Sequence, residues 1–219
     1  MFYEPRKGNH GLPFNPFKSI TVPRPIGWVS TLDVQGRLNL APFSQFQNLG
    51  FDPPYVMFAS EGRNDSPRNA QDTGEFVVNM ATWDLREQMN ITAQKVPPGM
   101  NEAELAGLEM VPSSLVQAPR VAASPVNMEC RFHCTLVLPG REPGAFSSVG
   151  VGEVIGIHIR DEFIGADGKL DILKMRPLAR LGYLDYTSVT EVFTMPPHGD
   201  GTGTLSRGLE GRPLSEVKG

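Results

Sequence analysis

The sequence predicts a mainly β fold, a β-rich α+β domain with a few short helices. One observation is that 23 glycines and 20 prolines are spread over the 219 residues, which indicates many turns between short elements. The other is a series of strand-like apolar stretches, each bounded by Gly, Pro or Asp. With 40% hydrophobic residues, the chain is long and apolar enough to bury a full core.

The strand-like stretches follow one another along most of the chain. Their alternation of apolar and polar residues is the pattern of strands with one face on a core. The predicted strands are 26–32, 55–60, 76–80, 126–138, 149–160 and 182–189.

The stretch 126–138 has the clearest pattern, because its apolar residues occupy every second position from Val126 to Leu138. It predicts one long, half-buried antiparallel strand. Cys130 and Cys134 lie four residues apart in it, which in a strand is about 13 Å and too far for a disulfide. Both are therefore expected to be small buried hydrophobic residues.

Three short helices are expected between the strands. Ser66 and Pro67 fit an N-cap followed by proline at the first helical position, with Gly74 as the stop. Thr82 fits the N-cap of a helix over 83–93. Asn101 with Glu104 resembles a capping box, and Gly107 would end that helix.

The domain organisation follows from a change in composition near Met195. Residues 1–195 are expected to form one domain, whereas 196–219 are rich in Gly, Pro and charge and are expected to form an arm or a disordered tail. The N-terminus lacks the apolar run of a signal peptide, and no stretch of about 18 apolar residues occurs, so a cytoplasmic location is expected.

The charge pattern excludes some functions. The 20 basic and 24 acidic residues are mixed, with a net charge of −4, so no broad basic field exists for nucleic acid or an anionic membrane. A phosphate group would have to be bound locally.

A first candidate site is the stretch 23–54, which reads as a strand, a turn at 33–36, a return strand and a Pro-Pro exit. Small and hydroxyl residues such as Ser30, Thr31 and Ser44 gather on it. They suit a wall for a flat polar ring system, but they also suit an ordinary strand surface. Trp28 and Phe46 are expected in the core, while the role of Phe43 stays open.

A second candidate site is the stretch Arg63–Asn69, where two arginines and a capping serine surround a predicted helix N-terminus. Free N–H groups and the helix dipole favour a phosphate there. The alternative is a capped surface helix with solvated arginines.

Together these blocks resemble the flavin-reductase-like family of FMN-binding split-barrel proteins. The resemblance rests on an ordered set of motifs from about Phe17 to Val189, in which no single piece is specific. The motifs are Arg24-Pro25, Val29-Ser30-Thr31, Asn39 with Ala41-Pro42 and Ser44, Asp52-Pro53-Pro54, Asn64-Asp65-Ser66 with Asn69, 74–79, 152–158, and 176–182 with Tyr186.

The resemblance implies a split β-barrel homodimer with FMN at the subunit interface, the phosphate on the Ser66 loop and the ring against the wall formed by the stretch from Ser30 to Ser44. The cofactor-binding residues it implies are Arg24, Val29, Ser30, Thr31, Asn39, Ala41, Pro42, Phe43, Ser44, Arg63, Asp65, Ser66, Arg68 and Asn69. The sequence departs from the family pattern at two places. Asn64 replaces the usual phosphate-loop lysine, so the cation would come from Arg63, Arg68 or Arg24. Gly182-Tyr183 replaces a pair of glycines that is usual in the family.

The catalytic chemistry would come from the flavin, so no acid/base pair is required. In this family a histidine on the matching strand can approach the flavin, which makes His158 a weak catalytic candidate, although a histidine between two isoleucines is more often structural. His10, His133 and His198 show no metal-site spacing, and no metal is expected. The chain also lacks a Gly-x-Gly-x-x-Gly turn, so NAD(P)H would bind transiently over the flavin.

The leading functional hypothesis is a flavoprotein oxidoreductase that passes electrons from NAD(P)H through FMN to free flavin, a metal chelate or a partner oxygenase. One alternative is an FMN electron carrier or sensor that a partner protein reduces. Another is a β-barrel interaction domain without a cofactor. The sequence does not distinguish NADH from NADPH and does not identify the electron acceptor.

Overall fold

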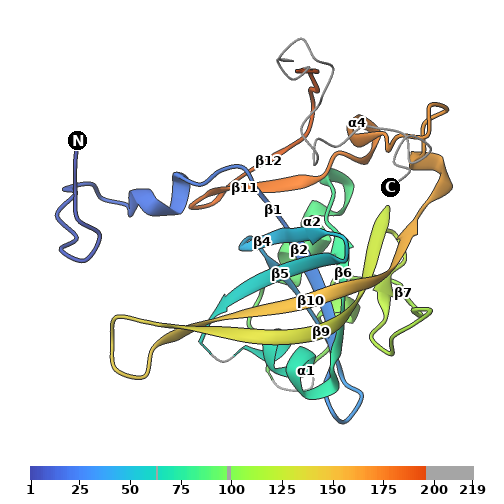
Figure 1. Cartoon of the computed structure of the whole chain (residues 1–219), viewed down its shortest axis with the longest axis horizontal. Coiled ribbons are helices and arrows are strands. Elements are labelled where there is room, and N and C mark those ends of the chain that lie inside the picture. Colours follow the sequence, from blue (N-terminus) through green and yellow to red (C-terminus); the bar gives the residue numbers. More distant parts are fainter. Residues whose placement is uncertain (63, 98–99, 196–219) are drawn as a thin grey trace.

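A seven-stranded antiparallel sheet forms the body of the molecule (Figure 1). The computed structural model describes residues 1–62, 64–97 and 100–195. The strand order is β3-β2-β6-β9-β10-β5-β4, so β3 and β4 are its edges. The bounds are β2 Gly27–Leu32, β3 Leu38–Phe43, β4 Phe46–Phe51, β5 Pro54–Glu61, β6 Glu75–Met80, β9 Val126–Pro139 and β10 Phe146–Ile159. The mainly β prediction is confirmed.

Two smaller sheets flank this body. One has the order β1-β11-β12, with β1 at Arg24–Pro25, β11 at Leu178–Gly182 and β12 at Asp185–Ser188. The other pairs β7, Met110–Val111, with β8, Arg120–Val121. The single strand predicted over 182–189 was wrong: Gly182 and Tyr183 both have positive φ angles, of 102° and 47°, and turn the chain back between β11 and β12.

The first helix, α1, covers Asp65–Thr73. Its N-cap is Asn64, not Ser66 as predicted, because Asn64 has extended backbone angles while Ser66 already lies inside the helix. Gly74 ends the helix at a φ of 79°, as predicted.

The predicted helix over 83–93 is shorter and divided. A 3₁₀ turn, η2, covers Trp83–Leu85, and α2 covers Arg86–Ile91. Thr82 is the N-cap, although its side chain accepts no capping hydrogen bond.

The N-cap predicted at Asn101 is confirmed. The Asn101 side chain accepts from the N–H groups of Ala103 and Glu104 and donates to the Glu104 carboxylate, at the start of α3. This helix, α3, covers Glu102–Leu105. The other short helices are α4 Ile172–Met175, η1 Pro16–Ser19 and η3 Asp161–Phe163.

The core fills the space on the inner side of the sheet. Trp28, Phe58 and Phe76 are completely buried, and the Phe58 and Phe76 rings meet edge to face with centroids 5.2 Å apart. Phe46 packs against the same cluster, so the core predictions for Trp28 and Phe46 are confirmed.

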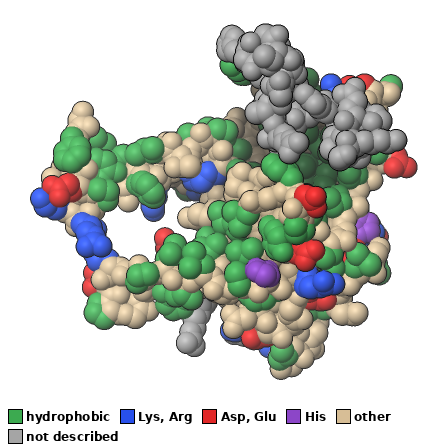
Figure 2. Space-filling view, in the orientation of Figure 1, with side chains coloured by type: hydrophobic (Ala, Val, Ile, Leu, Met, Phe, Trp, Pro, Cys, Tyr) green, Lys and Arg blue, Asp and Glu red, His purple; other side chains and the backbone are tan. Residues whose placement is uncertain are grey.

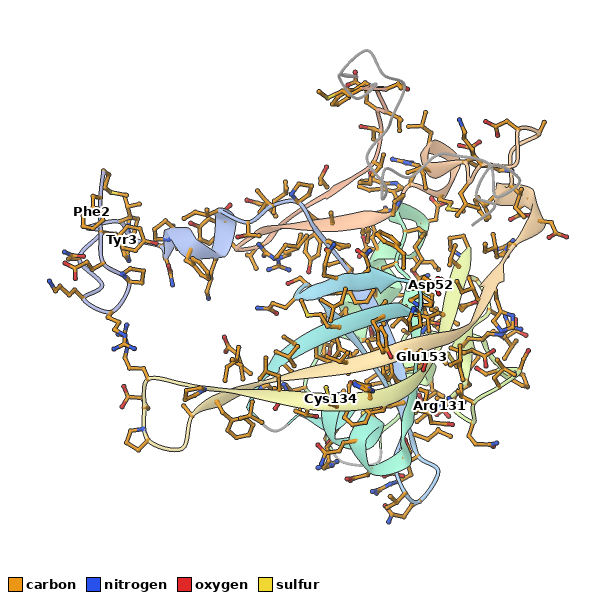
Figure 3. All side chains as sticks on the ribbon, in the orientation of Figure 1. Phe2, Tyr3, Asp52, Arg131, Cys134 and Glu153 are labelled. Carbon is orange, nitrogen blue, oxygen red and sulfur yellow. The ribbon has the colours of Figure 1, made fainter. Side chains whose placement is uncertain are left out.

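The long strand β9 is not half-buried along its whole length. Its first part is buried on both faces, including Asn127 and Glu129, whereas Cys134 is exposed. The reason is that β6 pairs with β9 only as far as Arg131, so the following residues have β10 as their only strand partner among the described residues. Cys130 is buried as predicted. The prediction of a buried Cys134, which is labelled on β9 in Figure 3, was wrong.

Two extensions project from the same side of the body: the N-terminal arm and the β9–β10 hairpin (Figure 1). They meet at one contact, where Nη2 of Arg141 donates to the carbonyl of Pro5 over 2.9 Å. Figure 2 shows an open space between them. The segment 196–219, expected to be an arm or a tail, lies outside the described residues, as does Arg63.

Candidate functional site

A groove lies along the open edge of β3, which among the described residues pairs only with β2. It has a volume of about 400 Å³, within the usual range for small-molecule sites. Three segments besides β3 contribute to it: the start of α1, the residues after α2, and the start of α3. The lining residues are Asn39, Ala41, Pro42, Phe43, Asn64, Asp65, Ser66, 92–96 and Glu102.

Asn39 ties the strand to the helix. Its side-chain nitrogen donates to Oγ of Ser66 over 2.7 Å, which holds β3 against the N-terminus of α1. Asn64, directly before the helix, donates to Oγ of Ser60 and to the carbonyl of Glu61. The first N–H groups of a nine-residue helix therefore lie at the groove, and they favour an anion.

The three β2 residues named from the sequence lie beneath the groove. Val29, Ser30 and Thr31 are each 0% exposed. The Ser30 hydroxyl donates to the carbonyl of Pro119 over 2.5 Å, and the Thr31 hydroxyl accepts from the Asn69 amide over 3.2 Å. Both hydroxyls are thus used within the protein and hold neighbouring segments together.

The arginines named from the sequence have different positions. Arg68 is paired with Asp65, with Nη2 2.5 Å from Oδ1, on the outer side of α1. Arg24 belongs to the small sheet and donates to the carbonyls of Lys18 and Thr21. Neither Arg24 nor Ser44 is among the residues that line the groove.

Among the groove residues that the sequence did not indicate, two are charged. Lys95 follows α2, in a stretch without a recognisable motif, and brings a cation to the groove. Glu102 begins α3 and accepts from the N–H of Leu40 over 3.3 Å. Burial raises the pKa of Glu102, with a smaller contribution from the nearby Asp65. The capping box at Asn101 was the available signal, since it placed Glu102 in a first helical turn.

His158 pairs with Glu129 and is not among the residues lining the groove. Glu129 is completely buried and accepts from the N–H groups of Ser114, Leu115 and Val116 at 2.7, 2.6 and 3.1 Å. Burial would raise the pKa of Glu129, but these N–H groups and the His158 ring outweigh it and lower the pKa. This geometry favours the structural interpretation of His158.

Two negative findings apply to the described part of the chain. No group of three or more His, Cys, Asp or Glu side chains is arranged to hold a metal ion. No helix there is both long enough and apolar enough to cross a membrane.

The fold and the groove together define a split β-barrel with a ligand-sized site on its edge strand, and comparison with known proteins identifies the class. Residues 19–174 match the model of the flavin reductase like domain. The chain therefore belongs to the flavin-reductase-like family, and the resemblance drawn from the motifs is confirmed.

Relatives agree with this assignment. An uncharacterized protein of Aquifex aeolicus is 38% identical over 168 residues, which are 74% of this chain and 83% of the relative. Nitrilotriacetate monooxygenase component B from Bacillus cereus is 27% identical with a TM-score of 0.83, over 89% of this chain and 98% of that one. The 2-nitrobenzoate 2-nitroreductase of Pseudomonas fluorescens is 28% identical with a TM-score of 0.73, over 88% and 92%. The predicted split barrel is confirmed.

Proposed function

We propose that the chain binds FMN in the groove along β3, with the ring beside Ala41, Pro42 and Phe43 and the phosphate at the N-terminus of α1. The observation that carries this proposal is the junction of an open strand edge with a helix N-terminus, fixed by the hydrogen bond between Asn39 and Ser66. The strand edge offers main-chain N–H and C=O groups to a pyrimidine edge, and the helix offers N–H groups to a phosphate.

The charges of the groove are consistent with one phosphate group. Lys95 lines it and would supply the cation missing at Asn64. Arg68 is paired with Asp65 and lines a pocket that adjoins the groove, not the groove itself, and Arg63 lies outside the described residues. Asp65 and Glu102 oppose an anion, but burial raises the pKa of Glu102 and so disfavours its charged form.

The β2 residues have a supporting role in this proposal. Because Val29, Ser30 and Thr31 are buried, they fix the positions of β3 and α1 and do not contact the ring through their side chains. Asn39, Ala41, Pro42 and Phe43 form the contact surface.

When bound, FMN supplies two-electron redox chemistry, accepting a hydride from NADH or NADPH, which is oxidised to NAD(P)⁺. The residues of the chain bind and orient the flavin and limit its contact with water. A partner oxygenase is one candidate acceptor, since the similar Bacillus cereus protein is a component of a monooxygenase; free flavin and a metal chelate are others.

The test of the redox function is steady-state oxidation of NADH and NADPH by the FMN-loaded protein, with free flavin or ferricyanide as acceptor. We expect oxidation that depends on the protein and on FMN. If FMN binds but neither nicotinamide reduces it without a second protein, the electron-carrier alternative replaces the reductase.

We also propose that the chain forms a homodimer. Apolar side chains on the hairpin, Leu136, Val137 and Leu138, are 55%, 58% and 47% exposed, and Phe14 and Phe17 on the N-terminal arm are 67% and 65% exposed. A second copy of the chain would cover these exposed apolar side chains on the hairpin and on the N-terminal arm. A cytoplasmic location remains part of the proposal.

A further inference from the structure

A separate pocket, of about 380 Å³, lies between α2 and the three-stranded sheet of β1, β11 and β12. One wall comes from η2 and α2, and the other comes from β11, β12 and the turn between them. Its volume is in the usual range for small-molecule sites. The pocket shares no lining residue with the groove along β3. Its lining residues are Trp83, Arg86, Glu87, Met89, Asn90, Leu178, Arg180, Leu184, Tyr186 and Thr187.

Two backbone hydrogen bonds hold the two walls together. The N–H of Trp83 donates to the carbonyl of Arg176, and the N–H of Leu178 donates to the carbonyl of Ala81, each over 2.9 Å. Met89, from one wall, and Leu178, from the other, are only 2% and 4% exposed, so they form an apolar floor. The relative position of the walls is therefore set by the backbone.

Arg86, on the α2 wall, is oriented by its neighbours. Its guanidinium carbon lies 4.3 Å from the centre of the Trp83 ring, and its Nη1 donates to the carbonyl of Trp83 over 2.8 Å. Its Nε lies 3.4 Å from Oε1 of Glu87. An arginine has five N–H donors in a rigid fork, so these contacts orient the guanidinium and leave donors for a ligand.

Arg180, on the opposite wall, is held in a similar way. Its guanidinium carbon lies 4.3 Å from the centre of the Tyr186 ring, and its Nη atoms donate to the Tyr186 hydroxyl and to the carbonyl of Tyr183. Arginine stays charged at physiological pH. Among the lining residues, Arg86 and Arg180 bring two positive charges, against one negative charge from Glu87. The pocket therefore favours an anion.

The apolar surface of the pocket favours an anion with a flat apolar body. Besides the floor, the pocket is lined by Leu184 and by the rings of Trp83 and Tyr186. A small inorganic anion would leave this surface in contact with water, whereas an aromatic ring would cover it. A carboxylate on that ring can accept two parallel hydrogen bonds from a guanidinium.

We propose that this pocket binds a small aromatic carboxylate, with the carboxylate at Arg86 and Arg180 and the ring over Met89 and Leu178. Because the site lies outside the flavin groove, the proposal does not depend on FMN binding. It gives the chain a second small-molecule ligand besides a flavin.

The experiment is titration calorimetry of the full-length protein with benzoate, without flavin and with FMN. Benzamide, which has the ring without the charge, and acetate, which has the charge without the ring, are the comparison ligands. The variants are Arg86→Gln and Leu184→Asp; Leu184 is 88% exposed, so its replacement disturbs no core. Thermal melting of each variant checks that it folds.

Each variant has a matched control. Arg160→Gln removes an arginine that also lies over an aromatic ring, 5.7 Å from the centre of the Phe163 ring, but that does not line the pocket. Val34→Asp places the same new charge as Leu184→Asp on the exposed turn between β2 and β3.

We expect saturable binding of one benzoate per chain, about tenfold tighter than binding of benzamide or acetate. Arg86→Gln and Leu184→Asp should each weaken benzoate binding about tenfold, the first by removing donors and the second by charge repulsion, and both controls should stay within about twofold.

Three results would overturn the inference: no saturable binding of benzoate, equally tight binding of benzamide or acetate, or benzoate binding that both variants leave unchanged. If Arg86→Gln does not fold, Leu184→Asp decides. Since benzoate is titrated with and without FMN, a failure here leaves the flavin site standing, and a protein that binds benzoate but no flavin would refute only the proposed function.

Discussion

At the scale of single residues, Glu129 is the most constrained carboxylate in the described structure. It is completely buried in β9, accepts three backbone N–H groups from the loop at 114–116 and contacts His158. Because the folded protein lowers its pKa, Glu129 contributes stability above the unfolded pKa, about 4.3, and this stability is lost as pH falls through the folded value.

Glu129→Gln should therefore lower the free energy of unfolding by about 3 kcal/mol at pH 7, because the amide nitrogen cannot accept the N–H groups that one carboxylate oxygen accepts. Urea unfolding at pH 7 and near pH 3.5 measures this, and the difference from the natural chain should shrink at the lower pH. Glu61→Gln, at the exposed end of β5, is the control. An equal loss at both pH values would contradict the role of the charge.

At this scale, the sequence could not predict which way the side chains of β2 point. It named Ser30 and Thr31 for the flavin wall, but it could not show that β2 lies between β3 and β6, where both hydroxyls are buried and bonded internally. Lys95 was missed because it lies in a loop whose path depends on how α2 and α3 pack. Asn39 and Ser66, which the sequence named as cofactor-binding residues, do line the groove, because their motifs place them at the edge strand and the helix start.

At the scale of elements, the packing of the Phe76 ring of β6 against the backbone of β10 depends on a glycine. A Cβ atom at Gly152 would lie 2.4 Å from the nearest atom of the buried Phe76 ring, whereas at Gly150 the nearest atom, in the Phe58 ring, would be 3.2 Å away.

Gly152→Ala should therefore cost about 2 kcal/mol of stability through overpacking, and Gly150→Ala clearly less. Chemical denaturation of both variants makes the comparison. Combining Gly152→Ala with Phe76→Leu should recover part of the loss, since the two sites are in contact. If Gly152→Ala were as stable as the natural chain, β10 would not pack on Phe76 as described.

The proposed phosphate site also belongs to the scale of elements, because it would be formed by the start of α1 together with the loop after α2. Lys95→Ala and Ser66→Ala should each weaken FMN binding by about 1–3 kcal/mol, since each variant removes a hydrogen-bond donor that the proposal places at the phosphate. Riboflavin, which lacks the phosphate, should bind both variants nearly as well as the natural chain. Titration calorimetry with both ligands measures this, and equal weakening for both would place the phosphate elsewhere.

Helix ends were predicted correctly where a single residue type marks them. Gly74 ends α1 and Asn101 caps α3 because these residue types have few alternatives at such positions. The start of α1 was predicted two residues too late, because Pro67 was taken as the first helical position. The alternating pattern of β9 also did not show that β6 pairs with this strand only as far as Arg131. Strand pairing is a non-local property, so exposure along β9 could not be predicted from alternation.

At the scale of the whole molecule, both projecting arms expose apolar side chains that nothing in the described part of the chain covers. The exposed apolar residues of the β9–β10 hairpin and the N-terminal arm lie on the same side of the body (Figures 1 and 2). A homodimer in which each copy covers these arms removes that surface from water.

Val137→Asp and Leu138→Asp, made together, should convert the dimer to a monomer. Light scattering coupled to gel filtration gives the mass directly. Val34→Asp is the matched control, because Val34 is 67% exposed on the turn between β2 and β3. A natural chain that is monomeric would contradict the proposal, and so would a double variant that remains dimeric.

The central claim is that the groove along β3 holds a flavin, and the absorbance spectrum of the purified full-length protein, before and after addition of FMN, tests it most directly. The account predicts a yellow protein, or one that becomes yellow on titration, with flavin bands that remain with the protein on gel filtration. A colourless protein that retains no FMN, FAD or riboflavin would contradict it and leave a barrel domain without a cofactor.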